Sequence, residues 1–229
     1  MASSLELDSD EPLPRLWNAL AKARVIAVTT LHSADQAEPL CRALLEGGVS
    51  ALELTMRTPA APKALSAMRA AGPALLLGAG TLLSPQQADA ALAPGAVFGL
   101  APGFDAEVVR HCASIGLPFV PGIATASEIQ QAVRLGSRLL KFFPAEPLGG
   151  ARGLRTLAAP FAHLGIKYLP LGGIGPDTTK AYLAERSVAA VGGSWITSDD
   201  LVRGCQWDLI KRNAARAAAI AAELVNPLV

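Results

Sequence analysis

Residues 168–195 read YLPLGGIGPDTTKAYLAERSVAAVGGSW. Two short apolar runs, YLPL and VAAV, enclose a stretch with helical spacing, and a pair of glycines follows each run. Strands of a parallel sheet are buried on both faces and therefore form continuous apolar runs. The stretch predicts a buried strand, a helix that covers it, and a second buried strand.

The same alternation extends over most of the chain. Short apolar runs recur at nearly even spacing, at 25–30, 51–56, 74–80, 96–103, 117–122, 139–144, 168–173 and 188–195. The segments between them are rich in alanine and have helix signals, such as Ser33 and Ser84 as N-caps and Pro85 at a first helical position. Strands that alternate with helices in this way form either a closed (β/α)8 barrel or an open doubly wound sheet.

The barrel is the better match of the two. No G-x-G-x-x-G motif follows the first run, which argues against the dinucleotide-binding form of the open sheet. The 229 residues suit one barrel domain, and no linker or low-complexity insert divides them. We expect an α/β protein with a single (β/α)8 TIM barrel at residues 15–229, after a flexible tail at residues 1–14.

Composition narrows the class of function. The formal net charge is +1 without blocks of like charge, which argues against a nucleic-acid or membrane-surface partner. The three cysteines and three histidines are scattered singly, so we expect free thiols and no metal site. The N-terminal residues lack the basic start and apolar core of a signal peptide, and no apolar run is long enough to span a bilayer. We expect a cytoplasmic protein.

Polar side chains occupy one face of the second expected strand. In ELTMRT, Glu53, Thr55 and Arg57 alternate with apolar residues, so they share the face that points into a barrel. A carboxylate and a guanidinium are costly inside a barrel unless they are paired or used. They are therefore either catalytic groups or a structural ion pair between strand and loop.

A lysine lies within the sixth expected strand, in LLKFFP. Apolar surroundings disfavour the charged ammonium of Lys141, and a neutral amine attacks the carbonyl carbon in Schiff-base enzymes. The alternative is a lysine that extends from the strand end to solvent. Taken alone, Lys141 leaves both interpretations open.

Glycines gather at the ends of the expected strands, where barrel enzymes carry their active sites. Those in GAGT, APG and PGIAT either let the backbone approach a ligand or form ordinary turns. The pairs Gly172–Gly173 and Gly192–Gly193 follow the last two strands, and the loops there form a recurrent phosphate site in barrels. These two pairs predict phosphate binding.

Taken together, the motifs resemble those of 2-keto-3-deoxy-6-phosphogluconate (KDPG) aldolases, a group that overlaps in activity with 4-hydroxy-2-oxoglutarate aldolases. The matching segments occur in the family's order and are ELTMRT at 53–58, GAGT at 78–81, PG at 102–103, PGIAT at 121–125, KFFPAE at 141–146, GGI at 172–174 and GGSW at 192–195. KFFPAE and GGSW are the most specific of them.

The resemblance implies a trimer of barrels and a class I mechanism, without a cofactor or a metal. It implies that Lys141 forms the Schiff base and that Glu53 is the general acid and base. The other implied contacts are Arg57 and Thr81 to the pyruvate carboxylate, Pro102, Phe143 and Leu171 along the pocket, and Gly172, Gly173, Gly193 and Ser194 to the phosphate.

Two positions depart from the family pattern. KDPG aldolases usually read PTGGI where this chain has PLGGI, so Leu171 replaces a threonine near the substrate. The first strand, VIAVTT, lacks the proline or arginine often found there. The alternatives are therefore an aldolase for the galactonate epimer of KDPG, an aldolase for 4-hydroxy-2-oxoglutarate, and a non-catalytic barrel that binds a phosphorylated ligand.

Overall fold

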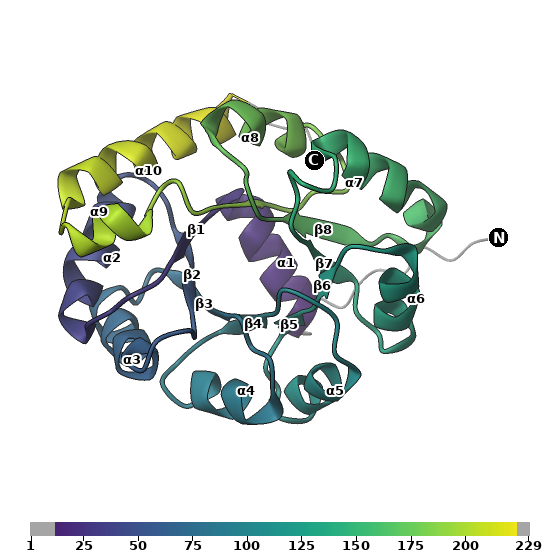
Figure 1. The fold of residues 1–229 in the computed structure, drawn as a ribbon, viewed down its shortest axis with the longest axis horizontal. Coiled ribbons are helices and arrows are strands. Elements are labelled where there is room, and N and C mark those ends of the chain that lie inside the picture. The colour runs from purple at the N-terminus through teal and green to yellow at the C-terminus, as the bar shows by residue number, and fades with distance from the viewer. Residues whose placement is uncertain (1–11, 224–229) are drawn as a thin grey trace.

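The computed structural model describes residues 12–223, with helices arranged around an inner layer of strands (Figure 1). The strands are β1 (Val25–Thr29), β2 (Ala51–Thr55), β3 (Leu76–Gly80), β4 (Phe98–Leu100), β5 (Phe119–Val120), β6 (Gly122–Ile123), β7 (Leu139–Phe142), β8 (Lys167–Pro170) and β9 (Val191–Gly193). The helices are α1 (Pro12–Ala23), α2 (Ala37–Glu46), α3 (Ala61–Ala71), α4 (Pro85–Leu92), α5 (Ala106–Ser114), α6 (Ala126–Arg134), α7 (Gly150–Ala158), α8 (Pro176–Leu183), α9 (Asp199–Arg203) and α10 (Trp207–Ala222), with 3-10 turns η1 (Ala34–Gln36) and η2 (Ala159–Leu164).

The strand pairings are parallel and follow two orders, β5-β4-β3-β2-β1-β9 and β6-β7-β8. Pro121 separates β5 from β6, and proline has no N–H to donate to a strand ladder. Backbone hydrogen bonds also join β8 to the segment before β9. The Tyr168 amide donates to the Ser187 carbonyl at 2.7 Å, and the Ala189 amide donates to the Tyr168 carbonyl at 2.9 Å. The expected α/β class with parallel strands is confirmed.

The N-cap residues and the first-turn proline predicted from the sequence lie at the starts of helices in the structure. Ser33 forms a capping box at η1, directly before α2, and Ser84 caps α4 with Pro85 at its first position. The structure differs at the N-terminal end, where α1 begins at Pro12 and so includes residues 12–14 of the expected tail. The rest of that expected tail lies outside the described residues.

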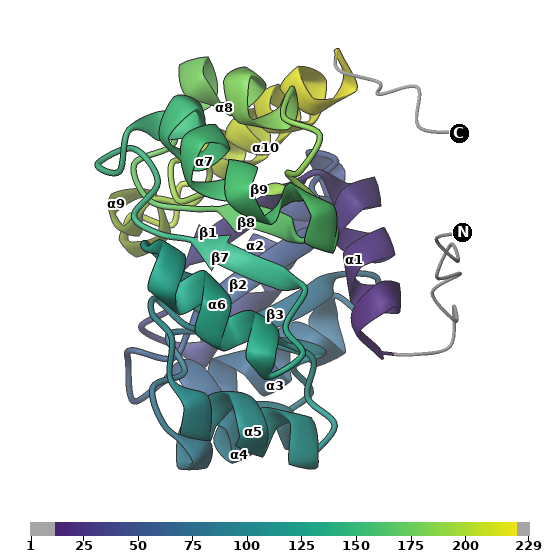
Figure 2. The same ribbon diagram turned by 90° about the vertical axis from the view of Figure 1, so that its right-hand side faces the viewer.

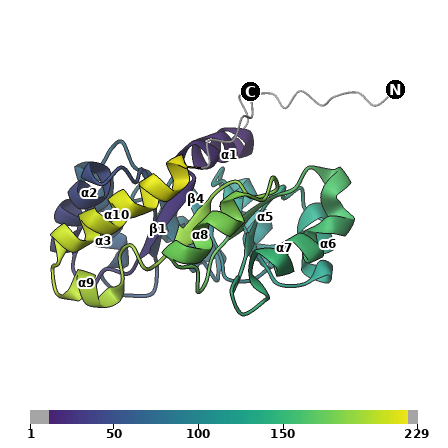
Figure 3. The same ribbon diagram turned by 90° about the horizontal axis from the view of Figure 1, so that it is seen from above.

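Apolar side chains form two clusters, one on each face of the strand layer. The outer cluster, between strands and helices, includes Leu52 and Leu54, as the alternation in ELTMRT predicts. The inner cluster includes Ile26, Phe98 and Leu169, together with buried leucines of α1. Figures 2 and 3 show α1 at one end of the strands, beyond the ring of helices.

Helix α1 covers the end of the strand layer at which the strands begin. Leu16 and Leu20, four residues apart on one helix face, are buried in the inner cluster. Lys167, the first residue of β8, lies over the ring of Trp17 with its ammonium 5.1 Å from the ring centroid. Because α1 covers the end at which the strands begin, the open end of the strand layer is the one with the carboxyl ends of the strands. Among residues 12–223, no helix is long and apolar enough to cross a membrane.

Candidate active site

The inner face of the strand layer holds a buried ion pair. The Lys141 ammonium nitrogen on β7 lies 3.1 Å from Oε1 of Glu53 on β2, and 3.5 Å from Oε2. Lys141 is 5% exposed and Glu53 is 1% exposed. The lysine therefore does not extend to solvent, and Glu53 pairs with Lys141 instead of with Arg57.

A buried pair of this kind is expensive to form. Two charges lose their hydration, and a single contact between them does not fully compensate. The ring of Phe143 adds a second contact, because its centroid lies 5.3 Å from the Lys141 ammonium. A buried amine, a carboxylate and an aromatic ring are therefore brought together, and an amine beside a proton-transfer group can carry out carbonyl chemistry.

Two glycines near the Lys141–Glu53 pair leave space for neighbouring groups. A β-carbon on Gly80, the last residue of β3, would overlap the Glu53 carboxylate. A β-carbon on Gly122, which pairs with Lys141 across β6 and β7, would overlap the backbone of Pro102. Pro102 is half-buried and lies with Gly103 against this part of the strand layer.

Arg57 and two threonines form a chain of hydrogen bonds at the ends of β1 and β2. The Arg57 Nη2 donates to Thr30 Oγ1 at 2.9 Å, and the two hydroxyl oxygens of Thr30 and Thr55 lie 2.8 Å apart. Arg57 was identified from the sequence, whereas Thr30 was missed. Its contact with Thr55 depends on the register between β1 and β2, which pairs Thr29 with Leu54 and brings Thr30 beside Thr55.

Thr81 directly follows β3 and has φ +62°. This left-handed backbone conformation is unusual for a β-branched residue and costs on the order of 1–3 kcal/mol. Strain of this kind clusters at functional sites, and Thr81 follows the glycine that accommodates Glu53.

A cavity of about 470 Å³ opens at the carboxyl ends of the strands. It is lined by Val28, Thr30, Arg57, Gly173, Ile174, Gly175, Ser194, Trp195, Thr197, Ser198 and Asp199. Three expected site residues, Arg57, Gly173 and Ser194, thus share one cavity. Pockets lined by a few convergent polar groups are the usual place for small ligands.

The expected phosphate glycines have different surroundings. Gly172 and Gly173 have φ +99° and +81°, a conformation that disfavours other residues, in the loop before α8. The side-chain space at Gly192 is instead filled by Leu171, and a β-carbon on Gly193 would lie 2.7 Å from Trp195 Nε1. Gly192 therefore serves close packing, Gly193 lies beside the Trp195 side chain, and Gly173 borders the cavity.

Asp199 lines the cavity and was missed in the sequence, because α9 is short and polar. Arg203 Nε donates to Asp199 Oδ2 at 2.6 Å, and His32 Nε2 lies 2.7 Å from Oδ1. The hydrogen bond from Arg203, followed by the one with His32, holds the pKa of Asp199 below its usual value. The aspartate therefore stays ionised, with its charge balanced by Arg203.

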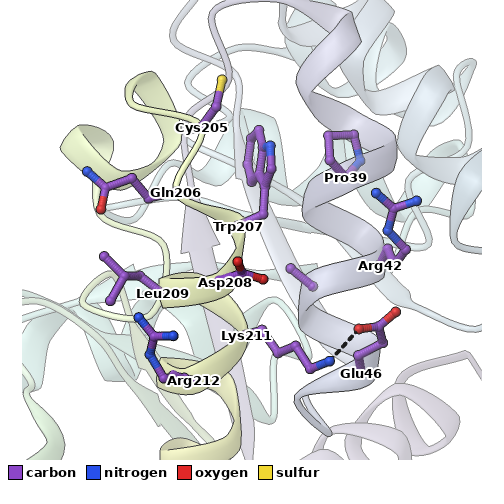
Figure 4. Close-up of a pocket in the computed structure, with 11 residues that line it drawn as sticks. Pro39, Arg42, Glu46, Cys205, Gln206, Trp207, Asp208, Leu209, Lys211 and Arg212 are labelled. Carbon is purple, nitrogen blue, oxygen red and sulfur yellow. Dashed lines mark hydrogen bonds and ion pairs between the residues drawn. The ribbon is translucent and has the colours of Figure 1, made fainter.

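A second cavity, of about 490 Å³, lies on the outer surface between α2 and α10 (Figure 4). Its residues come from those two helices and the turn before α10, and the ion pair of Lys211 with Glu46 closes one side at 2.7 Å. No strand residue is among those that line it. Lys141 and Glu53 line neither cavity, but Thr55, two residues after Glu53 on β2, is linked by the Thr30 hydroxyl to the cavity at the strand ends.

Known proteins resemble this chain in sequence and in fold. Residues 16–213 match the family described as KDPG and KHG aldolase. The 2-dehydro-3-deoxy-phosphogluconate aldolase of Treponema pallidum is 44% identical over 181 residues, which are 79% of this chain and 85% of that protein. The KHG/KDPG aldolase of Escherichia coli K12 is 36% identical over 198 residues, 86% of this chain and 92% of that protein.

A solved structure resembles the fold over nearly its whole length. The KDPG aldolase of Legionella pneumophila, with pyruvate captured as a covalent carbinolamine intermediate, superposes with a TM-score of 0.83. The two chains are 35% identical, and the match covers 88% of this chain and 97% of the other.

Proposed function

The chain belongs to the KDPG and KHG aldolase family, and we propose that it is a class I aldolase that cleaves KDPG to pyruvate and glyceraldehyde 3-phosphate. The reaction is a carbon–carbon bond cleavage of the Entner–Doudoroff pathway. The observation that carries the proposal is the buried pair of Lys141 and Glu53, because class I chemistry needs an amine and a proton-transfer group side by side.

Proton transfer within the pair starts the reaction. At 3.1 Å, Glu53 takes a proton from the Lys141 ammonium, which frees the amine to attack the C2 ketone of the substrate. A proton moves from nitrogen to the C2 oxygen, and the carbinolamine forms. The protonated Glu53 then gives its proton to the departing hydroxyl, so water leaves and an iminium remains.

The iminium is the electron sink for bond cleavage. Glu53, again a carboxylate, takes the proton of the C4 hydroxyl, and the electrons of the C3–C4 bond move into an enamine. Glyceraldehyde 3-phosphate leaves. Glu53 returns its proton to C3, and water hydrolyses the pyruvate iminium to release pyruvate and regenerate Lys141.

Binding of the substrate is assigned to the groups around the pair. In the proposal, Arg57 and Thr81 hold the pyruvate carboxylate, with the guanidinium supplying two parallel hydrogen bonds. Pro102, Phe143 and Leu171 line the pocket. Gly172, Gly173, Gly193 and Ser194 hold the phosphate, and Gly173 and Ser194 border the same cavity as Arg57.

The proposal includes the architecture and assembly of the protein. We propose that the strands act as one closed (β/α)8 barrel and that residues 15–229 form a single domain; the backbone hydrogen bonds between Tyr168 and the segment before β9 support closure. The family resemblance supports a homotrimer in the cytoplasm, without a cofactor, a metal, a membrane or a nucleic acid. Sedimentation of the purified protein tests the trimer.

A specific observation favours a second substrate. Leu171 is 3% exposed and belongs to the inner cluster with Phe143. Its side chain offers no hydrogen bond where the usual family pattern PTGGI has threonine, so the galactonate epimer of KDPG, and also 4-hydroxy-2-oxoglutarate, are candidate substrates. The buried Lys141–Glu53 pair argues against a non-catalytic barrel that only binds a phosphorylated ligand.

The deciding experiment is borohydride reduction in the presence of pyruvate, followed by peptide mapping. We expect a stable carboxyethyl group on Lys141 and pyruvate release from KDPG in a coupled assay. Lys167 is the internal control, because it is a partly buried strand lysine at the opposite end of the layer, and desolvation lowers its pKa. Modification of Lys167 instead, or of no lysine, would contradict the proposal.

A further inference from the structure

Thr30 and Thr55 occupy neighbouring positions at the carboxyl ends of two parallel strands. Thr55 ends β2 and is 3% exposed, and Thr30 follows β1. Their hydroxyl oxygens lie 2.8 Å apart. Thr55 shares the inner face of β2 with Glu53, two residues earlier.

The guanidinium of Arg57 is the donor in its hydrogen bond with Thr30. Arginine has donors and no acceptor, so Thr30 Oγ1 accepts from Arg57 Nη2 at 2.9 Å. The Thr30 hydroxyl still has its hydrogen and a second lone pair, so it either donates to Thr55 Oγ1 or accepts from it. In both cases the chain of hydrogen bonds links Arg57 through Thr30 to Thr55.

Arg57 depends on this contact for its orientation. Its side chain is exposed, and within residues 12–223 it has no carboxylate partner. A free arginine side chain samples many rotamers, and ordering it costs binding energy. The bond to Thr30 uses one donor and leaves the others for an anion in the cavity that Thr30 and Arg57 both line.

We propose that Thr30 and Thr55 are positioning residues that hold the Arg57 guanidinium ready for the substrate carboxylate. The inference rests on the proposed function for the identity of that anion. It adds residues that act through Arg57 and do not touch the reacting atoms. It also explains the polar end of VIAVTT, because an apolar residue at position 30 would leave the guanidinium without an anchor.

The test compares isosteric variants. Thr30→Val keeps the branched shape and removes the hydroxyl, and Thr30→Ser keeps the hydroxyl. Thr29→Val is the matched control, because the Thr29 hydroxyl is buried without a partner in the described structure and Thr29 lies beside Leu54 on the outer face. Thermal unfolding of each variant establishes that the fold is intact.

The functional readout is the half-saturation concentration for trapping by borohydride. Thr30→Val should raise this concentration about tenfold for pyruvate, the worth of one hydrogen bond to a charged group. Pyruvamide, which lacks the carboxylate, should bind Thr30→Val as it binds the wild type. Thr30→Ser and Thr29→Val should have the same half-saturation concentration for pyruvate as the wild type. In Thr30→Val, kcat for KDPG cleavage should change little. In an Arg57→Leu background, Thr30→Val should have no further effect.

A second readout does not depend on activity. NMR relaxation of the Arg57 guanidinium in the free protein should show an ordered group in the wild type and in Thr30→Ser, and a mobile one in Thr30→Val. An equally ordered Arg57 in Thr30→Val overturns the inference, as does an equal loss of affinity for pyruvate and pyruvamide. If the wild type traps no pyruvate, the proposed function fails, and the relaxation measurement still decides the positioning role.

Discussion

Gly80 leaves the space that the Glu53 carboxylate occupies: a β-carbon on Gly80 would lie 2.6 Å from both Cγ and Cδ of Glu53. The two residues lie on neighbouring strands, where Gly80 pairs with Thr55 and Glu53 pairs with Gly78. Gly78 is used similarly, because its side-chain space is filled by the ring of Phe98. The glycines of GAGT therefore accommodate inward side chains and do not form a turn.

The first prediction concerns that space. Gly80→Ala should push the Glu53 carboxylate away from Lys141 and lower kcat roughly 10²-fold, the cost of misplacing a catalytic group by about 1 Å. Gly78→Ala is the control, because its β-carbon would meet Phe98 in the inner cluster and should reduce stability more than chemistry. Turnover on KDPG and thermal midpoints separate the two effects. Full activity in Gly80→Ala would show that the carboxylate tolerates displacement.

The second prediction concerns proton transfer. Glu53→Gln keeps the shape of the side chain and removes the base, so turnover should fall roughly 10²–10⁴-fold. Borohydride should still trap some pyruvate at Lys141 at elevated pyruvate concentration, since attack by the amine is a separate step. The variant should also be less stable, because it leaves the Lys141 ammonium buried without its counter-charge. Near-normal turnover of Glu53→Gln would show that Glu53 has a structural role only.

The third prediction concerns the phosphate. Ser194 is exposed at the cavity, so Ser194→Ala removes a hydroxyl without disturbing the core. KM for KDPG should rise roughly tenfold, the worth of one hydrogen bond to a charged group, while an unphosphorylated analogue should be unaffected. A larger residue at Gly173 is a poorer test, because φ +81° and the Glu146 side chain at 2.9 Å both oppose a β-carbon. Equal changes in KM for KDPG and for the unphosphorylated analogue would show that the phosphate binds elsewhere.

Local patterns in the sequence identified single strands and single side chains. The alternation in ELTMRT predicted that Glu53 faces inward, and the apolar neighbours of Lys141 identified burial as one of two possible environments for that lysine. These inferences succeed because the period of a strand and the cost of burying charge are local properties. Ser33 and Pro85 marked helix starts for the same reason.

Contacts between distant segments could not be derived in this way. Glu53 and Lys141 are 88 positions apart, and their contact depends on how the strand layer curves. The packing of Leu171 against Gly192 likewise depends on neighbouring strands, so it could not be predicted from the glycine pair alone. Helix α1 was missed because its prolines and the acidic stretch before it resemble a tail.

The fourth prediction concerns pH. Burial raises the pKa of both Cys41 and Cys112 to about 11. Below about pH 9 these thiols are protonated in the folded and unfolded chains alike; between about pH 9 and pH 11 only the unfolded chain ionises, so the free energy of unfolding falls. We expect a loss on the order of 1–2 kcal/mol per thiol across this range.

Urea unfolding at about pH 8 and about pH 10.5 measures this loss. Cys41→Ala should flatten the pH dependence although it lowers stability at both values, because it removes one titrating thiol. Cys205→Ala is the control, since Cys205 is exposed and its replacement should leave the difference between the two pH values unchanged. A pH dependence that is identical in all three proteins would exclude the buried thiols as its source.

The last prediction concerns the selectivity between the two C4 epimers of the substrate. Leu171 directly follows β8, is 3% exposed, and fills the side-chain space of Gly192 within the inner cluster that also contacts Phe143. A site that hydrogen-bonds a substrate hydroxyl rejects the wrong epimer strongly, whereas an apolar wall discriminates less. Leu171→Thr should therefore raise the ratio of kcat/KM for KDPG over its galactonate epimer by about 1–2 kcal/mol, or roughly 5- to 30-fold. Leu171→Val is the matched control, because valine has the shape of threonine without the hydroxyl and leaves a similar cavity beside Gly192. If both variants shift the ratio equally, the space left by leucine sets the preference; if neither shifts it, Leu171 lies outside the contact that distinguishes the epimers.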